Sequence, residues 1–167
     1  ALYRRVSAEL IEKIDGAVEL RIFGVFGKYE DYAIRFISNA ICKALFDLPI
    51  TLRQNRKFDY LYVDDLMPIL DFFINNPLKH KAYNITPDEP MELLQLAEKV
   101  KMVSHKDLPI KVVQGDLGLE YSGSNLRLKK EMKNFQLTPI SQAVEGLYNW
   151  YFEHKNVLNK KALFQDK

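Results

Sequence analysis

The chain has a single cysteine, Cys42, which excludes an intramolecular disulfide and a metal site built from several thiolates. Cys42 lies within an apolar helical pattern, and this position predicts a buried and unreactive thiol. The sequence also lacks any run of 18 apolar residues and any secretory leader. These absences predict a cytoplasmic protein that does not enter a membrane.

An excess of charge of one sign is also missing. The 24 basic residues against 22 acidic residues give a net charge of +2, which is too small to indicate a nucleic-acid partner. One dense basic segment holds Arg127, Lys129, Lys130 and Lys133, and Glu131 within it favours an ordinary solvated face. The three histidines are scattered without metal-ligand spacing, so the sequence predicts no metal site; they are His80, His105 and His154.

Two catalytic motifs are absent. There is no Gly-x-Gly-x-x-Gly turn for a dinucleotide phosphate and no Gly-x-Ser-x-Gly nucleophile elbow.

The adjacent carboxylates Asp64 and Asp65 stand at a strand-to-helix junction and point different ways, so they cannot share a proton. Asp65 is instead predicted to cap the following helix, which places Pro68 at its third position, where no N–H is needed.

The residues that are present predict a folded α/β protein. Hydrophobic residues reach 47% and aromatic residues 12%, enough for a substantial core. Strands are expected at 18–26, 50–53, 58–63, 82–85 and 109–113. Helices are expected at 1–14, 32–46, 66–76, 91–103 and 125–132, with a last one capped by Thr138 and started by Pro139.

This pattern also predicts the organisation of the chain. Residues 1–155 form the folded part and residues 156–167 a polar tail, in which Leu163 and Phe164 could dock on the rest. The alternation of strands and helices favours a parallel sheet. We expect segments 18–26 and 82–85 to share one sheet, covered by the helices at 32–46 and 66–76. On the last helix, the inner face is predicted to hold Ile140, Val144, Leu147 and Tyr151.

Four segments resemble, in order and spacing, blocks of the extended short-chain dehydrogenase/reductase family. The segment LRIFGVFG (20–27) resembles its Leu-Arg-x-Phe-Asn-x-Tyr-Gly block, and FDYLYVDDL (58–66) resembles Asp-Phe-Ile-Tyr-Val-Asp-Asp. AYNIT (82–86) resembles its Tyr-Asn-Ile strand, and SNLRLKKEM followed by ISQAVEGLYNWYFE fits its final part. The resemblance covers residues 4–153. It implies the C-terminal portion of a Rossmann-type enzyme, with parallel strands and a small substrate-binding lobe.

The resemblance implies a function divided between two halves. An N-terminal Rossmann half would hold NAD or NADP, and a Tyr-x-x-x-Lys pair would move the proton. Aligned by distance to Leu20, Arg4 falls near the lysine position; another alignment makes Tyr3 the tyrosine, with Ser7 in the lysine position. The pair is incomplete in both alignments. The chain alone is therefore expected to be inactive and to bind no cofactor, whereas its parent is an NAD(P)-dependent nucleotide-sugar epimerase, dehydratase or reductase.

The same resemblance implies which residues border the substrate. Phe23, Gly24 and Val25 would lie beside the nicotinamide and the sugar. Gly24 replaces the asparagine of the family, so one polar contact is missing. Phe58 stands where the family commonly has an arginine that grips the diphosphate.

The missing arginine has two candidate replacements nearby, Arg53 and Arg56. A planar guanidinium suits the task because it can bind phosphate oxygens in a bidentate manner. The helix from Tyr32 and the strand from Pro49 would line the nucleotide pocket. An equally open interpretation makes both arginines solvated turn residues.

The resemblance also implies a homodimer in which the first helix joins a four-helix bundle. Val6, Leu10 and Ile14 would then face a second copy, although they could instead face their own sheet. Two other functions remain open for the whole chain. It could be a non-catalytic α/β binding module that kept the fold of the substrate lobe, or an unrelated α/β interaction domain.

Overall fold

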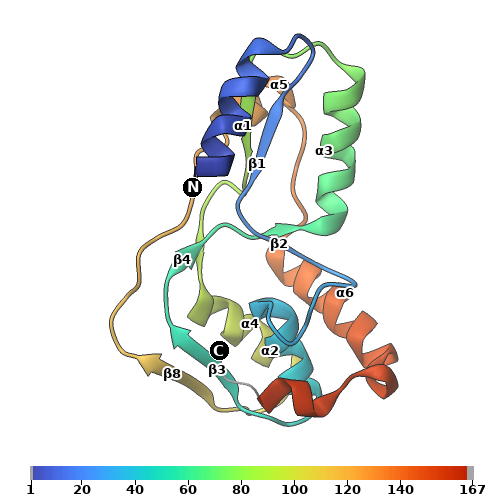
Figure 1. Ribbon diagram of the computed structural model, residues 1–167. Coiled ribbons are helices and arrows are strands. Elements are labelled where there is room, and N and C mark those ends of the chain that lie inside the picture. The colour runs from blue at the N-terminus through green and yellow to red at the C-terminus, as the bar shows by residue number, and fades with distance from the viewer. Residues whose placement is uncertain (1, 165–167) are drawn as a thin grey trace.

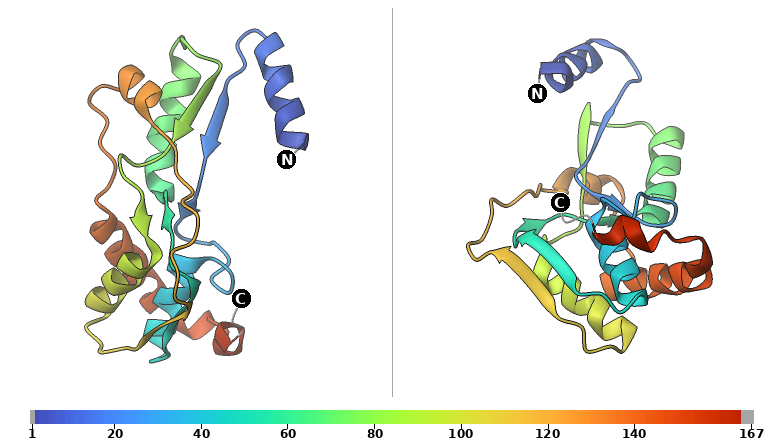
Figure 2. Two further views of the ribbon diagram at one scale, coloured as in Figure 1. Left: turned by 90° about the vertical axis from the view of Figure 1, so that its left-hand side faces the viewer. Right: turned by 60° about the horizontal axis from the view of Figure 1, so that its bottom comes forward.

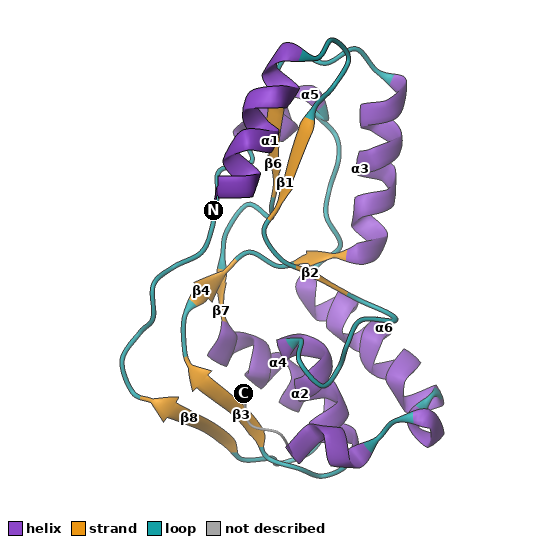
Figure 3. Cartoon of the chain, in the orientation of Figure 1, coloured by secondary structure: helices purple, strands orange, loops and turns teal. Residues whose placement is uncertain are grey.

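The computed structural model describes residues 2–164 and shows an elongated molecule with two lobes (Figure 1). The first lobe contains α1 (Leu2–Lys13), β1 (Glu19–Ile22), α3 (Val63–Asn75), β6 (Ala82–Ile85) and α5 (Leu126–Glu131). The second lobe contains α2 (Phe36–Leu45), β3 (Ile50–Gln54), α4 (Leu93–Ser104), β8 (Ile110–Gln114), α6 (Ile140–Glu153), η1 (Lys155–Val157) and η2 (Lys160–Phe164). Short strands connect the lobes (Figure 3): β2 (Val25–Phe26), β4 (Lys57–Phe58), β5 (Leu61–Tyr62) and β7 (Met91–Glu92).

The strands pair mainly in parallel, as the α/β prediction requires. β1 pairs with β6 in the register Leu20 to Tyr83, β2 pairs with β5, and β3 pairs with β8, all in parallel. Only β4 and β7 pair in the antiparallel direction. Parallel neighbours need long crossover connections, and here the crossover from β1 to β6 includes α2, β3 and α3. Two elements of the second lobe, α2 and β3, therefore lie within a connection of the first, and the others follow β6.

The core of the first lobe lies between α3 and the β1–β6 pair. Ile69 and Phe73 of α3 are buried against Tyr83 and Ile85 of β6, and the rings of Phe73 and Tyr83 lie 4.7 Å apart. The Tyr83 hydroxyl donates a hydrogen bond of 3.1 Å to Glu131 and so ties α5 to β6. The prediction that segments 18–26 and 82–85 share a sheet beneath the helix at 66–76 is confirmed.

The prediction that the helix at 32–46 covers this same sheet is wrong. α2 belongs to the core of the second lobe, where it packs against α4, α6 and β3. Its small residues Ala40 and Ala44 are as deeply buried as Ile37 and Ile41. A helix buried around most of its circumference needs neighbours on several sides, and a two-stranded sheet covers only one side.

The remaining predictions for the second core hold. Val144, Leu147 and Tyr151 of α6 are buried, and Ile140 packs against them at the edge of the core. Cys42 is fully buried, and burial raises the pKa of its thiol to about 12, as expected for an unreactive cysteine. Leu163 of η2 is buried in the same core, whereas the neighbouring Phe164 is exposed.

Two segments predicted as single strands are each broken in the middle. Segment 18–26 divides at Phe23-Gly24 into β1 and β2, and segment 58–63 divides at Asp59-Tyr60 into β4 and β5. The breaks lie side by side, because the backbone N–H of Leu61 donates to the carbonyl of Gly24 at 2.8 Å. The chain bends here from one lobe to the other, which a continuous strand could not do.

The expected cap of α3 is also wrong. The helix begins at Val63 with Tyr62 as its N-cap residue, so Asp65 is its third residue and Pro68 its sixth. The Asp65 carboxylate instead accepts hydrogen bonds from the backbone N–H of Thr138 at 3.0 Å and from its hydroxyl at 2.6 Å. This long-range pair replaces the local cap and fastens the start of α6 to α3.

Thr138 therefore does not cap α6 as predicted. The N-cap residue of α6 is Pro139, one position later than expected, and the helix begins at Ile140. A similar shift occurs at α4, which begins at Leu93 because Met91 and Glu92 form β7 instead. In both places the residues before the helix are used for contacts between segments distant in the sequence.

Helix α1 projects outward from the rest of the first lobe in the two views of Figure 2. None of its described residues is buried, and the exposed fractions of Val6, Leu10 and Ile14 are 46%, 54% and 52%. The interpretation that these three side chains face their own sheet is therefore wrong. No helix within residues 2–164 combines the length and the apolar character that a membrane span requires.

Candidate functional site

Aromatic rings from three distant segments meet at the junction between the lobes. The ring centroids of Phe23 and Tyr121 are 5.0 Å apart, those of Phe58 and Tyr121 are 5.1 Å apart, and those of Phe58 and Tyr60 are 4.8 Å apart. We call these four residues the junction cluster. Their centroid distances are typical of favourable aromatic pairs. The sequence identified Phe23 and Phe58 as candidate site residues, but it gave no signal for Tyr121.

Gly24 is in direct contact with this cluster. A Cβ atom at Gly24 would lie 2.5 Å from Cε1 of Phe58 and 2.9 Å from the carbonyl oxygen of Asp59. No side chain fits at position 24 while the Phe58 ring occupies this space. The two departures from the family pattern, glycine for asparagine and phenylalanine for arginine, are thus one packing arrangement.

The backbone of Asp59 helps to fix the position of Tyr121, because its N–H donates to the Tyr121 carbonyl. The Asp59 side chain is only 1% exposed, and its Oδ2 atom accepts a hydrogen bond of 2.7 Å from the backbone N–H of Gly123. The Oδ1 atom has no hydrogen-bond partner among the described residues, and burial raises the pKa of this carboxyl group. The backbone of Tyr121 bonds to both neighbours of Phe58, donating to Lys57 and accepting from Asp59.

A second feature is a cavity of about 230 Å³ between α2, β3 and the first residue of α4. Three cationic side chains line it, Lys43, Arg53 and Arg56, and no aspartate or glutamate among residues 2–164 does. We call it the cationic hollow. Its other lining residues are apolar or neutral: Ala33, Ile34, Phe36, Asn39, Thr51, Leu52, Gln54 and Leu93.

The cations of the hollow are held at different depths. Lys43 is only 4% exposed, and its ammonium group donates to the Thr51 hydroxyl at 2.5 Å. Arg56 is half-buried and Arg53 is exposed. The two guanidinium groups of Arg53 and Arg56 on a concave and partly apolar wall produce a field that attracts an anion. The hollow can therefore bind a phosphate-bearing group.

The segment from Arg53 to Phe58 connects the hollow with the junction cluster. Leu93, at the start of α4, donates its backbone N–H to the carbonyl of Arg56 at 3.1 Å, and Gly118 donates to the carbonyl of Asn55 at 2.7 Å. These bonds fix the segment between its neighbours on both sides. A ligand with its anionic part in the hollow would extend along this segment toward the aromatic rings.

The structure sorts the predicted site residues into separate places. Phe23, Gly24 and Phe58 meet at the junction cluster. Arg53 and Arg56 meet in the cationic hollow. The other two lie elsewhere, since Val25 packs against the core of the first lobe and Arg4 is exposed on α1. Arg4 belongs to neither feature. The three histidines are exposed on the surface, as predicted, and no group of three potential metal ligands forms within residues 2–164.

The described glycines do not form a cradle for a dinucleotide pyrophosphate. Such a cradle needs open backbone at a helix N-terminus. The space beside Gly24 is filled by Phe58, and the space beside Gly27 is filled by Val63. Gly146 is open but lies within α6, and Gly16 is open but follows the end of α1. Gly115 is also open but follows β8, so none of the described glycines forms such a cradle at a helix N-terminus.

Comparisons with known proteins agree with the geometry. Residues 11–86 match the model of the NAD dependent epimerase/dehydratase family. The dTDP-glucose 4,6-dehydratase from Bacillus anthracis, solved in complex with NAD, is similar with a TM-score of 0.79 at 16% identity, covering 96% of this chain and 52% of that one. No curated protein sequence matches the chain.

Two further solved structures share the fold. The UDP-glucuronic acid 4-epimerase from Bacillus cereus, in complex with UDP-glucuronic acid and NAD, has a TM-score of 0.66 at 20% identity and covers 83% of this chain and 45% of that one. A GDP-L-fucose synthetase from Naegleria fowleri has a TM-score of 0.69 at 15% identity and covers 86% of this chain and 48% of that one. The chain spans about half the length of the solved structures that it matches.

The parallel strand pairs and the likeness to the solved dehydratase show that the chain has the Rossmann-type α/β fold of these enzymes. Over residues 11–86 the chain is similar to the NAD-dependent epimerase/dehydratase family. The resemblance of the four sequence blocks predicted this family, and the prediction is confirmed.

Proposed function

We propose that this chain supplies substrate recognition to an NAD(P)-dependent nucleotide-sugar epimerase, dehydratase or reductase that works in the cytoplasm. The observation that carries the proposal is the cationic hollow, where Arg53 and Arg56 come together on one concave wall. A nucleoside diphosphate sugar carries two adjacent phosphates, which this arrangement can neutralise. The solved epimerase with bound UDP-glucuronic acid has the same fold and supports this ligand class.

The size of the hollow indicates how such a ligand would lie. Pockets that enclose a whole small ligand usually measure about 300–1,000 Å³. The hollow measures about 230 Å³ and therefore takes only the nucleotide part of the ligand. The sugar would point along the Arg53–Phe58 segment to the junction cluster, where Phe23 and Tyr121 offer ring faces on which a sugar can pack.

The hydride chemistry belongs, in this proposal, to NAD or NADP held by an N-terminal Rossmann half. The cofactor supplies the hydride acceptor, and a Tyr-x-x-x-Lys pair supplies the proton transfer. Within this chain, one alignment places Arg4 near the lysine position, and the other makes Tyr3 the tyrosine with Ser7 in the lysine position; all three lie on helix α1. Since no glycine cradle is present among the described residues, this chain alone is expected to bind neither cofactor.

Calorimetric titration of the purified protein tests this division of labour. UDP-glucose, dTDP-glucose and GDP-mannose are titrated separately, with NAD and NADP as the comparison. At least one nucleotide sugar should bind saturably, whereas neither cofactor should bind. Micromolar binding of NAD or NADP to this chain would refute the division, and binding of none of the three sugars would refute the recognition role.

The alternative function, a non-catalytic binding module, is distinguished by adding the N-terminal half. A complete enzyme that binds a nucleotide sugar and NAD(P) and converts the sugar to a new product supports the proposal. Binding of the sugar without formation of any product would favour the binding module instead. The junction cluster is the reason to make this comparison, because Gly24 and Phe58 both depart from the catalytic relatives.

We also propose that the complete enzyme is a homodimer formed through α1. The exposed side chains of Tyr3, Val6, Leu10 and Ile14 follow helical spacing, so α1 presents an apolar stripe that neither lobe covers. Sedimentation of the complete enzyme should give a dimer, and Leu10→Glu should shift it toward the monomer. A monomer at high micromolar concentration before any substitution would refute this interface.

A further inference from the structure

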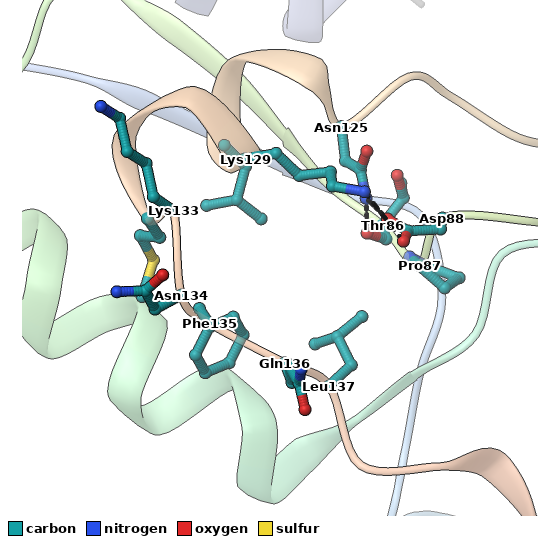
Figure 4. Close-up of a pocket in the computed structure, with 12 residues that line it drawn as sticks. Thr86, Pro87, Asp88, Asn125, Lys129, Lys133, Asn134, Phe135, Gln136 and Leu137 are labelled. Carbon is teal, nitrogen blue, oxygen red and sulfur yellow. Dashed lines mark hydrogen bonds and ion pairs between the residues drawn. The ribbon is translucent and has the colours of Figure 1, made fainter.

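A cavity larger than the cationic hollow lies outside the candidate site. It has a volume of about 670 Å³ and lies at the carboxyl end of β6, between α5 and residues 132–137 (Figure 4). We call it the β6-end cavity. None of its lining residues belongs to the junction cluster or to the cationic hollow. Its volume is within the range of small-ligand sites, and the carboxyl ends of parallel strands are a common place for them.

The inner wall of this cavity is apolar. Leu128, Met132, Phe135 and Leu137 line it, and Figure 4 shows Phe135 and Leu137 on one side of the open space. These four residues also belong to, or pack against, the core of the first lobe. The wall is therefore held in place by the fold, and it offers a preformed surface to an apolar group.

The rim is polar and has a net positive charge. Lys129 forms an ion pair of 2.9 Å with Asp88, and Asn125 donates to the same carboxylate at 2.9 Å. These two hydrogen bonds lower the pKa of Asp88, so it is a carboxylate at neutral pH. Lys133 makes no hydrogen bond or ion pair with residues 2–164, and its ammonium group points outward in Figure 4. Two lysines and one aspartate leave one positive charge at the rim.

The polar side chains of the rim can rearrange around a ligand with little loss of stability. The side chains of Lys129 and Asp88 are 56% and 65% exposed, and ion pairs this exposed contribute little to stability. The Lys129 ammonium has three donors and uses only one on Asp88. Lys133 is exposed and has a flexible side chain, so it can turn toward the cavity when an anion arrives.

We propose that the β6-end cavity binds a small monocarboxylate with an apolar body. The carboxylate would accept hydrogen bonds from Lys129 and Lys133, and the apolar body would lie against Leu128, Met132, Phe135 and Leu137. One negative charge balances the rim. A bare inorganic anion would leave the apolar wall unused, and a neutral apolar molecule would leave Lys133 without a partner.

A chain of contacts connects the cavity with the junction cluster. Asn125 faces the cavity and donates to the carbonyl of Thr86, while the hydroxyl of Thr86 donates to the carbonyl of Gly123. Gly123 in turn lies against the ring of Phe23, since a Cβ added there would be 2.6 Å from Cζ of Phe23. A bound carboxylate should therefore change the environment of Gly123 as well as that of the cavity.

The test follows the backbone amide shifts of the purified protein by NMR. The probe is phenylacetate, with phenylacetamide as the neutral analogue and inorganic phosphate as the anion without an apolar body. Phenylacetate should give saturable shifts at Leu128, Lys129 and Phe135, with a smaller shift at Gly123. Phenylacetamide should bind about tenfold more weakly, because it loses the charge-assisted bonds, and phosphate should give no saturable shift there.

Three variants locate the charge requirement. Lys129→Gln and Lys133→Gln should each weaken phenylacetate binding about tenfold. Lys130→Gln is the matched control, because Lys130 is an exposed neighbour in α5 that does not line the cavity. The proposal is overturned if phenylacetate gives no saturable shift, if the amide or phosphate binds equally well, or if Lys130→Gln weakens binding as much as the other two variants.

Discussion

Gly24→Ala is expected to lower the free energy of unfolding by about 1–3 kcal/mol, the usual cost of forcing a methyl group into packed space. The added Cβ would lie 2.5 Å from Cε1 of Phe58 and 2.9 Å from the carbonyl oxygen of Asp59. The ring can move, but the Asp59 backbone is held by Tyr121 and cannot move easily. Urea unfolding of the purified variant measures this loss.

A double-mutant cycle then tests whether Gly24 and Phe58 form one packing arrangement. Phe58→Ala removes the closer of the two clashes, so Gly24→Ala should cost less in a Phe58→Ala background than in the unchanged protein. The expected coupling is about 0.5–1.5 kcal/mol, because the clash with the Asp59 backbone remains. Additive free energies would show that the two positions are independent.

A matched control is available within α6. A Cβ at Gly146 meets nothing within 4 Å, so Gly146→Ala adds a methyl group without a clash. Alanine is favoured over glycine in a helix interior by about 1 kcal/mol, so this variant should be at least as stable as the unchanged protein. A loss at Gly146 as large as the loss at Gly24 would mean that the added methyl group has a general effect unrelated to Phe58.

The fold could be predicted from the sequence wherever local pattern decides the structure. The strand at 82–85 alternates buried and half-buried residues along one sheet, and its predicted bounds agree with the structure. The inner face of α6 was equally readable, since Val144, Leu147 and Tyr151 follow helical spacing. Asp65 shows where local pattern fails. Its position suited a helix cap, but Thr138, 73 residues later, takes both of its carboxylate oxygens.

The candidate site was likewise predictable only where local sequence pattern decides the structure. Arg53 and Arg56 lie beside a readable strand, so the sequence could place both near one pocket, and both line the cationic hollow. Tyr121 and Asp59 could not be identified, because their partners are more than 60 residues away in the chain. Tyr121 lies in a loop, and a loop sequence has no periodicity that would indicate which side chains point toward the protein and which toward solvent.

Arg53→Ala and Arg56→Ala are each expected to raise the Michaelis constant of the complete enzyme for its nucleotide sugar about 10- to 100-fold. Each substitution removes a charge-assisted bond to phosphate, and such a bond is worth roughly 1.5–3 kcal/mol. The turnover number should change less, because a phosphate contact remote from the reacting carbon is similar in the ground and transition states. Arg56→Ala should have the larger effect, since Arg56 is half-buried in the hollow and Arg53 is exposed.

Two comparisons separate a phosphate contact from a general effect of charge. Arg56→Lys keeps the charge but loses the planar fork, so it should lie between the unchanged enzyme and Arg56→Ala. Arg127→Ala removes the same charge from an exposed position outside the hollow and should leave the Michaelis constant unchanged. If neither Arg53→Ala nor Arg56→Ala changes the constant more than about twofold, well below the tenfold that 1.4 kcal/mol represents, both arginines are solvated turn residues. The diphosphate would then have to be held elsewhere.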